Sequence, residues 1–225
     1  SYASGFSTSE AALLPYLASR KQNRVDILVL SNGDQDHAGG LESVEAALEV
    51  SDRLSGEADQ LPGFRSCIAG ESWRWDGIDF RVLHPPPSIS FRKANDNSCV
   101  LHISNRHWSL LLSGDVEAEG EESLLTHIGE GLQADILVAP HHGSATSSSE
   151  AFVQAVRPRW VIFSTGYRNR YGFPKPSVVE RWHDAGAVSI NSAHAGAVGL
   201  QIYADRRPPR IWYQRERKRR YWQAK

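Results

Sequence analysis

The chain runs from the apolar stretch Val25-Asp26-Ile27-Leu28-Val29-Leu30 directly into the polar stretch Ser31-Asn32-Gly33-Asp34-Gln35-Asp36-His37, which Gly39 and Gly40 follow. The apolar stretch predicts a buried strand, and the glycines allow the backbone to turn tightly after it. Asp34, Asp36 and His37 supply carboxylate oxygens and an imidazole nitrogen, which are ligands of divalent metals. The loop therefore indicates a metal site, although Asp- and Gly-rich loops of this kind also occur as plain turns or helix caps.

Two further apolar stretches end in groups of the same chemistry. Residues 110–112 lead into Ser-Gly-Asp at 113–115, and residues 134–139 lead into Pro-His-His-Gly-Ser at 140–144. Each segment taken alone is more typical of a turn or of hydrogen-bonded polar residues. Because three predicted strands all end in ligand-type side chains, one shared metal site is favoured over three unrelated turns.

Strand patterns alternate with helix patterns along the chain, which predicts an α/β fold. Strand patterns occur near residues 25–30, 64–68, 78–83, 98–103, 108–112, 134–139, 160–164, 188, 198–202 and 211–213. Helix patterns occur near residues 11–21, 41–48, 116–127, 149–156 and 177–185. The many short strands in the middle argue against a purely parallel sheet. Because no linker is evident, we expect one domain at 1–204 and a basic, aromatic tail at 205–225.

Composition excludes two broad classes of protein. Of the 225 residues, 40% are hydrophobic and 23% are charged, which is ordinary for a globular domain and excludes disorder of the whole chain. The longest apolar runs are far shorter than the roughly 20 residues that a membrane span needs. The two cysteines, Cys67 and Cys99, are too few for a disulfide framework, and both lie in apolar runs, so we expect buried free thiols.

Charge is unevenly distributed between the two predicted parts. Residues 205–225 hold nine Lys or Arg against Asp205 and Glu216, whereas the remainder of the chain is acidic. A basic end on an acidic body indicates a polyanionic partner or an anionic membrane surface, and a solvated terminus remains an equal alternative. If the partner is a nucleic acid strand, the expected contacts are with five cations: Arg215, Arg217, Lys218, Arg219 and Arg220.

The ordered set of segments resembles the metallo-β-lactamase superfamily, whose metal-binding loop has the form His-x-His-x-Asp-His. More narrowly, residues 31–40 resemble the loop in the C-terminal domain of the ComEC/Rec2 family, the DNA-uptake channel proteins of bacterial natural transformation. The supporting segments follow in the family's order: Leu83-His84-Pro85, Asn95-Asp96-Asn97-Ser98, Ser113-Gly114-Asp115, Pro140-His141-His142-Gly143-Ser144 and Asn169-Arg170-Tyr171-Gly172. The resemblance covers about residues 9–203, and it is specific as a set rather than piece by piece.

The resemblance implies an αββα sandwich and a metal centre. The implied metal ligands are Asn32, Asp34, Asp36, His37, Asp115 and His141. Asn32 and Asp34 stand where two histidines of a first metal position would be, and Asp115 stands where relatives bridge two metals. The residues expected to act in catalysis are Asp36, Asp115 and His142. A carboxylate-rich ligand set favours Mn²⁺, with Mg²⁺ or Zn²⁺ as alternatives, in one or two ions.

The chain departs from the family pattern in three places. Asn32 replaces the usual first histidine, and an amide oxygen is a weak metal ligand. Phe173 stands where many relatives have a histidine after Tyr-Gly. Relatives also begin the domain with further strands ahead of the part that matches Ser1, so we expect a sandwich that lacks its first N-terminal strands.

The leading hypothesis is a metal-dependent nuclease that hydrolyses one strand of incoming DNA during uptake. The resemblance places it on the periplasmic or extracellular face of the cytoplasmic membrane, beside the membrane channel domain of the same full-length protein, with DNA as its partner. No nucleotide cofactor is expected, because no P-loop or dinucleotide fingerprint is present. The alternatives are a catalytically silent DNA-binding module and a metallo-hydrolase of a small phosphoester or acyl compound. A serine nucleophile at Ser144 is disfavoured because the Gly-x-Ser-x-Gly elbow is absent.

Overall fold

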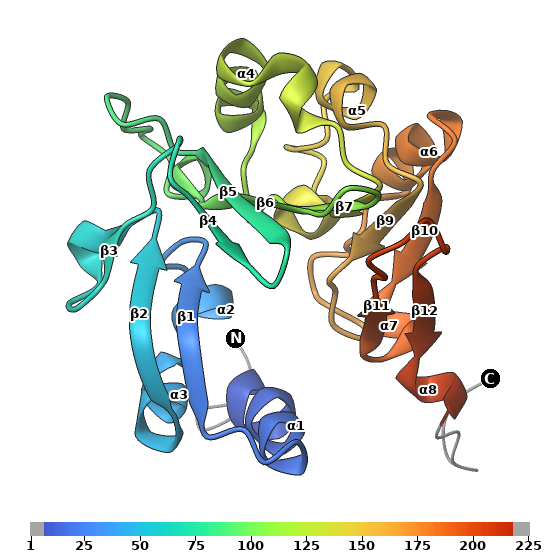
Figure 1. Ribbon diagram of the computed structural model, residues 1–225. Coiled ribbons are helices and arrows are strands. Elements are labelled where there is room, and N and C mark those ends of the chain that lie inside the picture. Colours follow the sequence, from blue (N-terminus) through green and yellow to red (C-terminus); the bar gives the residue numbers. More distant parts are fainter. Residues whose placement is uncertain (1–6, 218–225) are drawn as a thin grey trace.

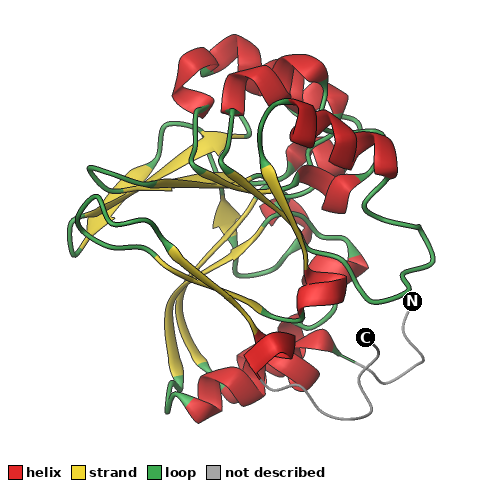
Figure 2. Cartoon of the chain, turned by 90° about the vertical axis from the view of Figure 1, so that its right-hand side faces the viewer, coloured by secondary structure: helices red, strands yellow, loops and turns green. Residues whose placement is uncertain are grey.

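A computed structural model describes residues 7–217 of the chain and shows two sheets that face one another between layers of helices (Figures 1 and 2). The first sheet is parallel and contains β1 (Arg24–Leu30), β2 (Glu49–Ser55) and β3 (Arg65–Ser66) in that order. The second sheet has seven strands in the order β10-β9-β8-β7-β6-β5-β4. A separate hairpin pairs β11 (Val198–Gln201) with β12 (Arg210–Tyr213), so residues 210–213 of the predicted tail form a strand.

The seven-stranded sheet is antiparallel in one half and parallel in the other, as the mixed strand pattern predicts. Its strands are β4 (Ser72–Trp75), β5 (Ile78–His84), β6 (Val100–Ser104), β7 (Ser109–Leu112), β8 (Ile136–Val138), β9 (Trp160–Phe163) and β10 (Val188–Asn191). Pairing is antiparallel from β4 to β7 and parallel from β7 to β10. Because β7 and β8 run in the same direction, the loops that follow them leave the same edge of the sheet.

The helices form two groups, one outside each sheet (Figure 2). The first sheet is covered by α1 (Leu14–Ser19) and α3 (Leu41–Ala47), and the larger sheet by α4 (Ala118–His127), α5 (Glu150–Val156) and α6 (Pro176–Asp184). The remaining short helices are α2 (Gln35–Ala38), α7 (Ser192–Ala195) and α8 (Gln214–Arg217). Short helical turns occur at η1 (Ser9–Leu13), η2 (Ala58–Gln60), η3 (Asn95–Asn97), η4 (Gly129–Leu132) and η5 (Pro140–Gly143).

Two hydrophobic cores fix this layering. Between the sheets, Leu54 of β2 packs with Val82 of β5 and Leu101 of β6. On the other face of the larger sheet, Leu111 and Phe163 pack with the buried helix residues Phe152 and Trp182, among others. The layers therefore follow from one apolar face on the first sheet and two on the second.

The sequence pattern missed two of the strands. The strand β2 carries Glu49, Asp52 and Arg53 beside the buried Val50 and Leu54, so it lacks a continuous apolar run. The strand β4 contains Trp73 in a stretch of only four residues that includes Arg74. The ring of Trp73 stacks on Phe80 of the neighbouring strand β5, with centroids 5.2 Å apart.

The expectation of two free thiols was wrong. Cys67 and Cys99 form a disulfide, with Cα atoms 5.8 Å apart, in the core between the two sheets. Both residues are buried, as predicted, but a pattern of apolar neighbours does not reveal that two distant segments meet. The bridge connects the end of β3 with the start of β6.

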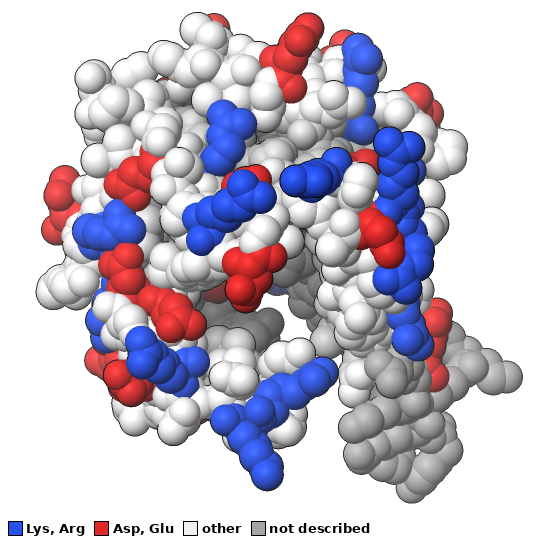
Figure 3. Space-filling model, in the orientation of Figure 1, with Lys and Arg blue, Asp and Glu red and all other residues white. Residues whose placement is uncertain are grey.

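No helix within residues 7–217 combines the length and the apolar composition that crossing a bilayer requires. Figure 3 shows basic and acidic side chains interspersed over one face of the molecule, which is hollowed between the part that carries α1 and the part that carries β11 and β12.

Candidate metal centre

Four ligand-type side chains converge at the edge where β1, β7 and β8 end. Asp36 and His37 lie on the one-turn helix α2, Asp115 follows β7, and His142 lies in the turn η5 after β8. One ligand atom from each of the four side chains lies within 4.8 Å of every other. We call these four residues the acid–histidine cluster. The ends of three strands thus supply one site, as the sequence pattern favours.

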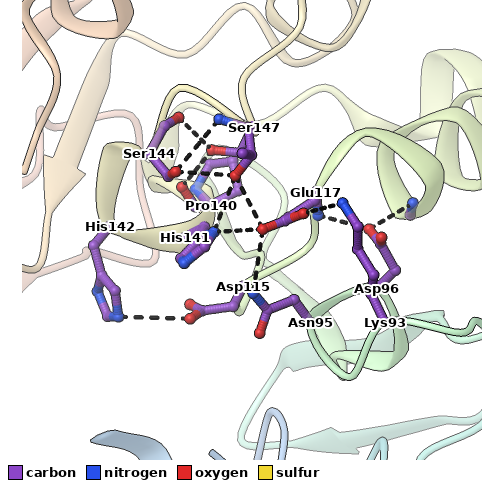
Figure 4. A network of polar contacts seen from close by, with 12 residues as sticks. Lys93, Asn95, Asp96, Asp115, Glu117, Pro140, His141, His142, Ser144 and Ser147 are labelled. Carbon is purple, nitrogen blue, oxygen red and sulfur yellow. Dashed lines mark hydrogen bonds and ion pairs between the residues drawn. The ribbon is translucent and has the colours of Figure 1, made fainter. Parts of the chain in front are cut away.

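The contacts inside the acid–histidine cluster centre on one carboxylate. Nε2 of His37 lies 3.0 Å from Oδ2 of Asp115, and Nε2 of His142 lies 3.6 Å from the same oxygen. Nε2 of His142 is also 3.3 Å from Oδ2 of Asp36. Asp115 is 3% exposed, whereas the side chain of Asp36 is 60% exposed, so the cluster is open to solvent on the side of α2. Figure 4 shows the ring of His142 directed at Asp115.

Electrostatics within the acid–histidine cluster shift the pKa values of both kinds of group. The close contact with the His142 imidazole lowers the pKa of Asp36 to about 2. Burial by itself lowers the pKa of His37, but the Asp115 carboxylate outweighs burial and the pKa is raised. The same balance holds for His142, where burial is outweighed by Asp36 and Asp115 and the pKa is raised. The two carboxylates therefore create a negative electrostatic potential that stabilises positive charge in the cluster.

Two buried nitrogen atoms that lie beside two carboxylates are consistent with a metal ion in the acid–histidine cluster. Nε2 of His37 and Nε2 of His142 are both shielded from solvent and lack a hydrogen bond of acceptable geometry, although carboxylate oxygens lie nearby. Buried polar atoms without a partner are rare and call for an explanation. Four ligand atoms that lie within 4.8 Å of one another are close enough to share one divalent cation.

Neighbouring groups set the orientation of His37. Its other ring nitrogen, Nδ1, lies 2.8 Å from the hydroxyl oxygen of Ser31. In metal sites, a ligating histidine characteristically uses its second nitrogen for such a contact, which fixes the ring and leaves Nε2 for the metal. Ser31 belongs to the loop quoted at the start of the sequence analysis, so this stretch supplies both the ligand and its support.

The backbone at the two adjacent histidines is unusual. His141 and His142 both adopt left-handed conformations, with φ of 45° and 54°, which cost energy for residues other than glycine. The turn is held by hydrogen bonds from the His141 amide to the Gly114 carbonyl and from the Ser147 hydroxyl to the Pro140 carbonyl. As a result, the two imidazole rings point to different partners.

His141 belongs to a second polar cluster beside the first. Its Nδ1 lies 3.0 Å from Oε1 of Glu117, and the hydroxyl of Thr146 donates to the same oxygen at 3.0 Å. Lys93 donates to Oε2 of Glu117 at 2.6 Å, and the amide of Asn95 donates to Oε1 at 3.3 Å. We call these five residues the Glu117 cluster, which Figure 4 shows next to Asp115. Burial raises the pKa of Glu117, but the donors outweigh burial and the pKa is lowered.

The structure separates the predicted metal ligands into two groups. Asp36, His37 and Asp115 lie in the acid–histidine cluster, together with His142, which was expected to act in catalysis. Asp34 and His141 lie outside this cluster, and the side chain of Asn32 is engaged in hydrogen bonds with Ser98 and the Asp34 backbone.

The positions of Asn32 and Asp34 have a structural explanation. Asn32 is fully buried, and its amide donates to the Ser98 hydroxyl while its Oδ1 accepts from the backbone amide of Asp34. Asp34 is exposed at the start of α2. Asp34 does not belong to the group of four, and the hydrogen bonds of Asn32 show that the amide at position 32 shapes the loop.

The motif Asn95-Asp96-Asn97-Ser98 forms hydrogen bonds with the backbone that carries Asp115 and Glu117. The Ser98 hydroxyl accepts the backbone amide of Asp115 at 3.0 Å, and Asp96 accepts the backbone amides of Glu117 and Gly120 at the start of α4. The side chain of Asn97 binds the backbone of Phe91 in both directions. These contacts fix the position of the strand end that carries Asp115.

Sequence reasoning missed Glu117 entirely. Glu117 is two residues beyond Asp115 and is 6% exposed, and it anchors four donors or charged neighbours. A second carboxylate at this spacing after a strand was the available signal. Of the predicted DNA-binding residues, Arg215 lies with its guanidinium 5.3 Å from the Tyr167 ring centroid, and Arg217 ends α8. Lys218, Arg219 and Arg220 lie outside the described residues.

Sequence comparison identifies related proteins, although no family model matches the chain. Competence protein ComA of Neisseria gonorrhoeae is 36% identical over 190 residues, which cover 84% of this chain and 27% of ComA. Recombination protein 2 of Haemophilus influenzae is 35% identical over 204 residues, which cover 90% of this chain and 25% of that protein. The ComE operon protein 3 of Bacillus subtilis is 30% identical over 190 residues. This chain belongs to the ComEC/Rec2 family. It spans about a quarter of the length of these curated relatives.

Solved structures show the fold of this ComEC/Rec2 family member. The metallo-β-lactamase fold protein YhfI from Bacillus subtilis matches with a TM-score of 0.50 over 82% of this chain and 80% of YhfI, at 11% identity. The diiron β-hydroxylase CmlA from Streptomyces venezuelae matches with a TM-score of 0.50 over 75% of this chain and 44% of CmlA, at 13% identity. The chain therefore has a metallo-β-lactamase fold, which confirms the predicted α/β class.

Proposed function

We propose that this chain is a metal-dependent phosphodiesterase, the nuclease domain of a DNA-internalisation protein that hydrolyses one strand of incoming DNA. The observation that carries the proposal is the acid–histidine cluster, in which two carboxylates and two buried imidazole nitrogens converge without satisfying one another. The names of the relatives, which refer to competence and recombination, support DNA as the substrate.

The residues Asp36, His37, Asp115 and His142 would hold one ion. A divalent cation supplies positive charge and Lewis acidity to a phosphoryl group in hydrolytic sites of this kind. Two carboxylates with two imidazoles suit Mn²⁺ or Zn²⁺, and the carboxylate share favours Mn²⁺. Ser31 orients His37, and the Ser98 hydroxyl fixes the backbone of Asp115, so the ligands are organised before the ion binds.

The Glu117 cluster would provide phosphate-binding side chains next to the metal ligands. The ring of His141 is held through Nδ1 by Glu117, and its side chain is partly exposed beside Asp115. Lys93, half exposed, brings positive charge to the same edge. These two side chains are positioned to contact the phosphates of a bound strand, while Glu117 keeps both in place.

The disulfide supports the proposed location on the periplasmic or extracellular face of the membrane. Disulfides persist in oxidising compartments and are rare in reducing ones. The Cys67–Cys99 bridge lies directly beside the site, since Cys99 follows Ser98 and its amide donates to the carbonyl of Ser31. The membrane channel part of the same full-length protein would be the neighbouring partner.

A cleavage assay tests this proposal. End-labelled single-stranded DNA is incubated with the purified chain in EDTA, Mg²⁺, Mn²⁺ or Zn²⁺, beside Asp115→Asn and the matched control Asp26→Asn, whose carboxylate is 72% exposed on β1. We expect metal-dependent cleavage that falls at least about 100-fold in Asp115→Asn and is unchanged in Asp26→Asn. Equal cleavage by parent and Asp115→Asn would contradict the assignment.

One observation favours a second function, a catalytically silent DNA-binding module. Asn32 is committed to Ser98 and to the Asp34 backbone, so the first metal position of the superfamily loop lacks its usual ligand. This alternative predicts salt-sensitive DNA binding with no cleavage in any of the metals. The same assay, run beside a binding measurement, separates the two.

A further inference from the structure

The loop between β9 and α6 has an unusual composition. Residues 166–175 read Gly-Tyr-Arg-Asn-Arg-Tyr-Gly-Phe-Pro-Lys, which gives three aromatic side chains, three cations and no acidic side chain. We call this segment the basic-aromatic loop. It is not part of the acid–histidine cluster, and the proposed chemistry does not use it.

Internal hydrogen bonds hold the basic-aromatic loop in one shape. The side-chain amide of Asn169 donates to the Phe173 carbonyl, and its oxygen accepts the Phe173 amide. The Lys175 ammonium donates to the Tyr171 carbonyl at 2.7 Å, and its backbone amide donates to the Gly143 carbonyl at 2.9 Å. The last bond ties the loop to the turn that carries His141 and His142.

Gly143 is required for this contact. It has a φ of +84°, and a Cβ there would lie 2.6 Å from Cβ of Pro174 and 2.7 Å from the ring of Phe163. The close approach of the two backbones sets the basic-aromatic loop against the edge of the acid–histidine cluster.

A series of rings connects the loop with the acid–histidine cluster. Tyr171 stacks on Phe173 with centroids 5.5 Å apart, and the Phe173 ring meets the His141 ring edge-on at 5.7 Å. The His141 and His142 centroids are 6.3 Å apart, and those of His142 and His37 are 5.4 Å apart. An exposed tyrosine is therefore linked to the proposed metal ligands through consecutive ring contacts.

Two tyrosines of the loop present their rings to solvent beside cations. Tyr167 is 50% exposed and Tyr171 is 54% exposed. The guanidinium groups of Arg168 and Arg215 each lie 5.3 Å from the Tyr167 ring centroid, and that of Arg170 lies 4.7 Å from the Tyr171 centroid. Large exposed aromatic rings next to several positive charges are the pattern of surfaces that stack bases and attract phosphates.

The loop also forms one wall of a groove of about 1200 Å³. The other walls come from α6, from β10 at the edge of the larger sheet, and from α7. Tyr167, Arg168 and Phe173 line it, and Glu180 is the one acidic residue among the described residues that do so. The groove is larger than the roughly 300–1000 Å³ typical of a small-ligand site, so an extended ligand fits it better.

We propose that the basic-aromatic loop, together with Arg215, is the binding track that leads a single strand of nucleic acid to the acid–histidine cluster, with unpaired bases stacking on Tyr167 and Tyr171. This inference rests on the proposed function and names the surface that binds its substrate. A single strand is favoured over a duplex because base stacking on an aromatic ring requires an unpaired base. It is favoured over an acidic protein because unpaired bases offer flat faces that stack on two exposed rings, whereas carboxylates engage only the cations and hydroxyl groups.

Binding is tested separately from cleavage. The fluorescence anisotropy of a labelled oligo-thymidine strand is followed in EDTA for the parent chain, for Tyr167→Ala, for Tyr171→Ala and for the double variant. We expect each single variant to weaken binding about 5- to 100-fold, which corresponds to the loss of one stacked base. A duplex of equal length should bind more weakly than the single strand and should respond little to either variant.

Tyr16→Ala provides a matched control. Tyr16 lies on α1, is 57% exposed, and has the guanidinium of Arg20 at 5.5 Å from its ring centroid, so it reproduces the local chemistry away from the groove. We expect this variant to bind like the parent. The track is wrong if the parent does not bind the strand, if the Tyr167 and Tyr171 variants bind as tightly as the parent, or if Tyr16→Ala loses as much affinity as they do.

Failure of the track and failure of the nuclease proposal give different results. If the parent cleaves in the presence of metal while the tyrosine variants bind and cleave like the parent, the track is wrong and the nuclease proposal stands. If binding depends on Tyr167 and Tyr171 but no metal produces cleavage, the track stands and the chain is a binding module. Melting temperatures of all variants show that exposed substitutions leave the fold intact.

Discussion

The acid–histidine cluster and the Glu117 cluster lie side by side and use the same chemistry, but only the Glu117 cluster has a lysine paired with its carboxylate. Each contains a buried carboxylate and a histidine from the same turn. In the Glu117 cluster, Lys93 brings a positive charge, and Thr146 and Asn95 complete the hydrogen bonds of the carboxylate. In the acid–histidine cluster, no lysine or arginine within residues 7–217 forms an ion pair with Asp36 or Asp115.

The difference shows what separates a metal site from a polar network. The kinds of residue are alike, and the deciding feature is whether the protein itself supplies the positive charge. Where it does, the carboxylate is paired, as Glu117 is with Lys93, Thr146 and Asn95. Where it does not, the Nε2 atoms of His37 and His142 lack a hydrogen bond and the two carboxylates have no lysine or arginine partner among the described residues, which is the arrangement that a divalent cation fits. The predictions below change one cluster and leave the other as the reference.

The largest effect is expected from exchanging one carboxylate in each cluster for its amide. Asp115→Asn removes the oxygen on which both histidines converge, whereas Glu117→Gln alters the self-sufficient cluster. In the parent, Mn²⁺ at about 100 times its dissociation constant should stabilise the fold by about 2.7 kcal/mol. At the usual scaling this raises the melting temperature by about 5–10 °C.

The melting temperatures of the parent, of Asp115→Asn and of Glu117→Gln are measured with and without Mn²⁺. Asp115→Asn should lose the rise in melting temperature, and Glu117→Gln should retain most of it, although its own melting temperature falls because Lys93 and His141 lose a partner. A rise that persists in Asp115→Asn, or one that disappears in Glu117→Gln alone, would reverse the roles assigned to the two clusters.

Reduction of the disulfide tests the scaffold that both clusters share. The bridge closes a loop with a sequence separation of 32 residues, so its loss should lower the free energy of unfolding by about 2–4 kcal/mol. Ser98 precedes Cys99 and holds the backbone of Asp115, so Mn²⁺ binding should weaken as well. Denaturant unfolding of the parent and of Cys67→Ser with Cys99→Ser measures the first effect. Unchanged stability would show that the bridge does not contribute to the scaffold.

His84 provides a histidine of the opposite kind, buried without a carboxylate in direct contact. Its Nδ1 donates to the Ser98 carbonyl at 3.1 Å, and burial lowers its pKa from 6.5 to about 4. Because the folded state disfavours the proton, stability is fully present above pH 6.5 and is lost as pH falls toward 4. The loss from this group should reach about 3 kcal/mol at most.

Unfolding free energies of the parent and of His84→Asn between pH 7.5 and 4 measure this effect. The variant keeps a donor for the Ser98 carbonyl but cannot take up the proton, so its stability should fall less steeply with pH than that of the parent. Identical slopes would show that His84 is not held neutral in the fold.

The sequence predicted much of the fold because most strands of the larger sheet are clear runs of apolar residues. It did not reveal β2, since charged residues interrupt that strand, or the Cys67–Cys99 pairing, since a pairing between distant segments leaves no mark in either one. For the site, strand ends that carry acids and histidines predicted the place where Asp36, His37 and Asp115 meet.

The sequence could not distinguish His141 from His142. The two residues are adjacent, of the same type and in the same loop, and only the left-handed backbone at both positions determines which ring points to which cluster. Such a conformation is unusual for histidine, so no sequence pattern predicts it. Glu117 escaped prediction for a related reason, because its partners Lys93, Asn95 and Thr146 come from distant segments.

The most direct test of this account is a calorimetric titration of Mn²⁺ into the parent, His142→Ala and His141→Ala. The two variants remove neighbouring imidazoles from one turn, so they are matched in size, in position and in the left-handed backbone that the new alanine must adopt. The account predicts that His142→Ala weakens Mn²⁺ binding by at least about 10- to 100-fold, while His141→Ala stays close to the parent. Equal losses in both variants, or a larger loss in His141→Ala, would contradict the claim that the acid–histidine cluster holds the metal.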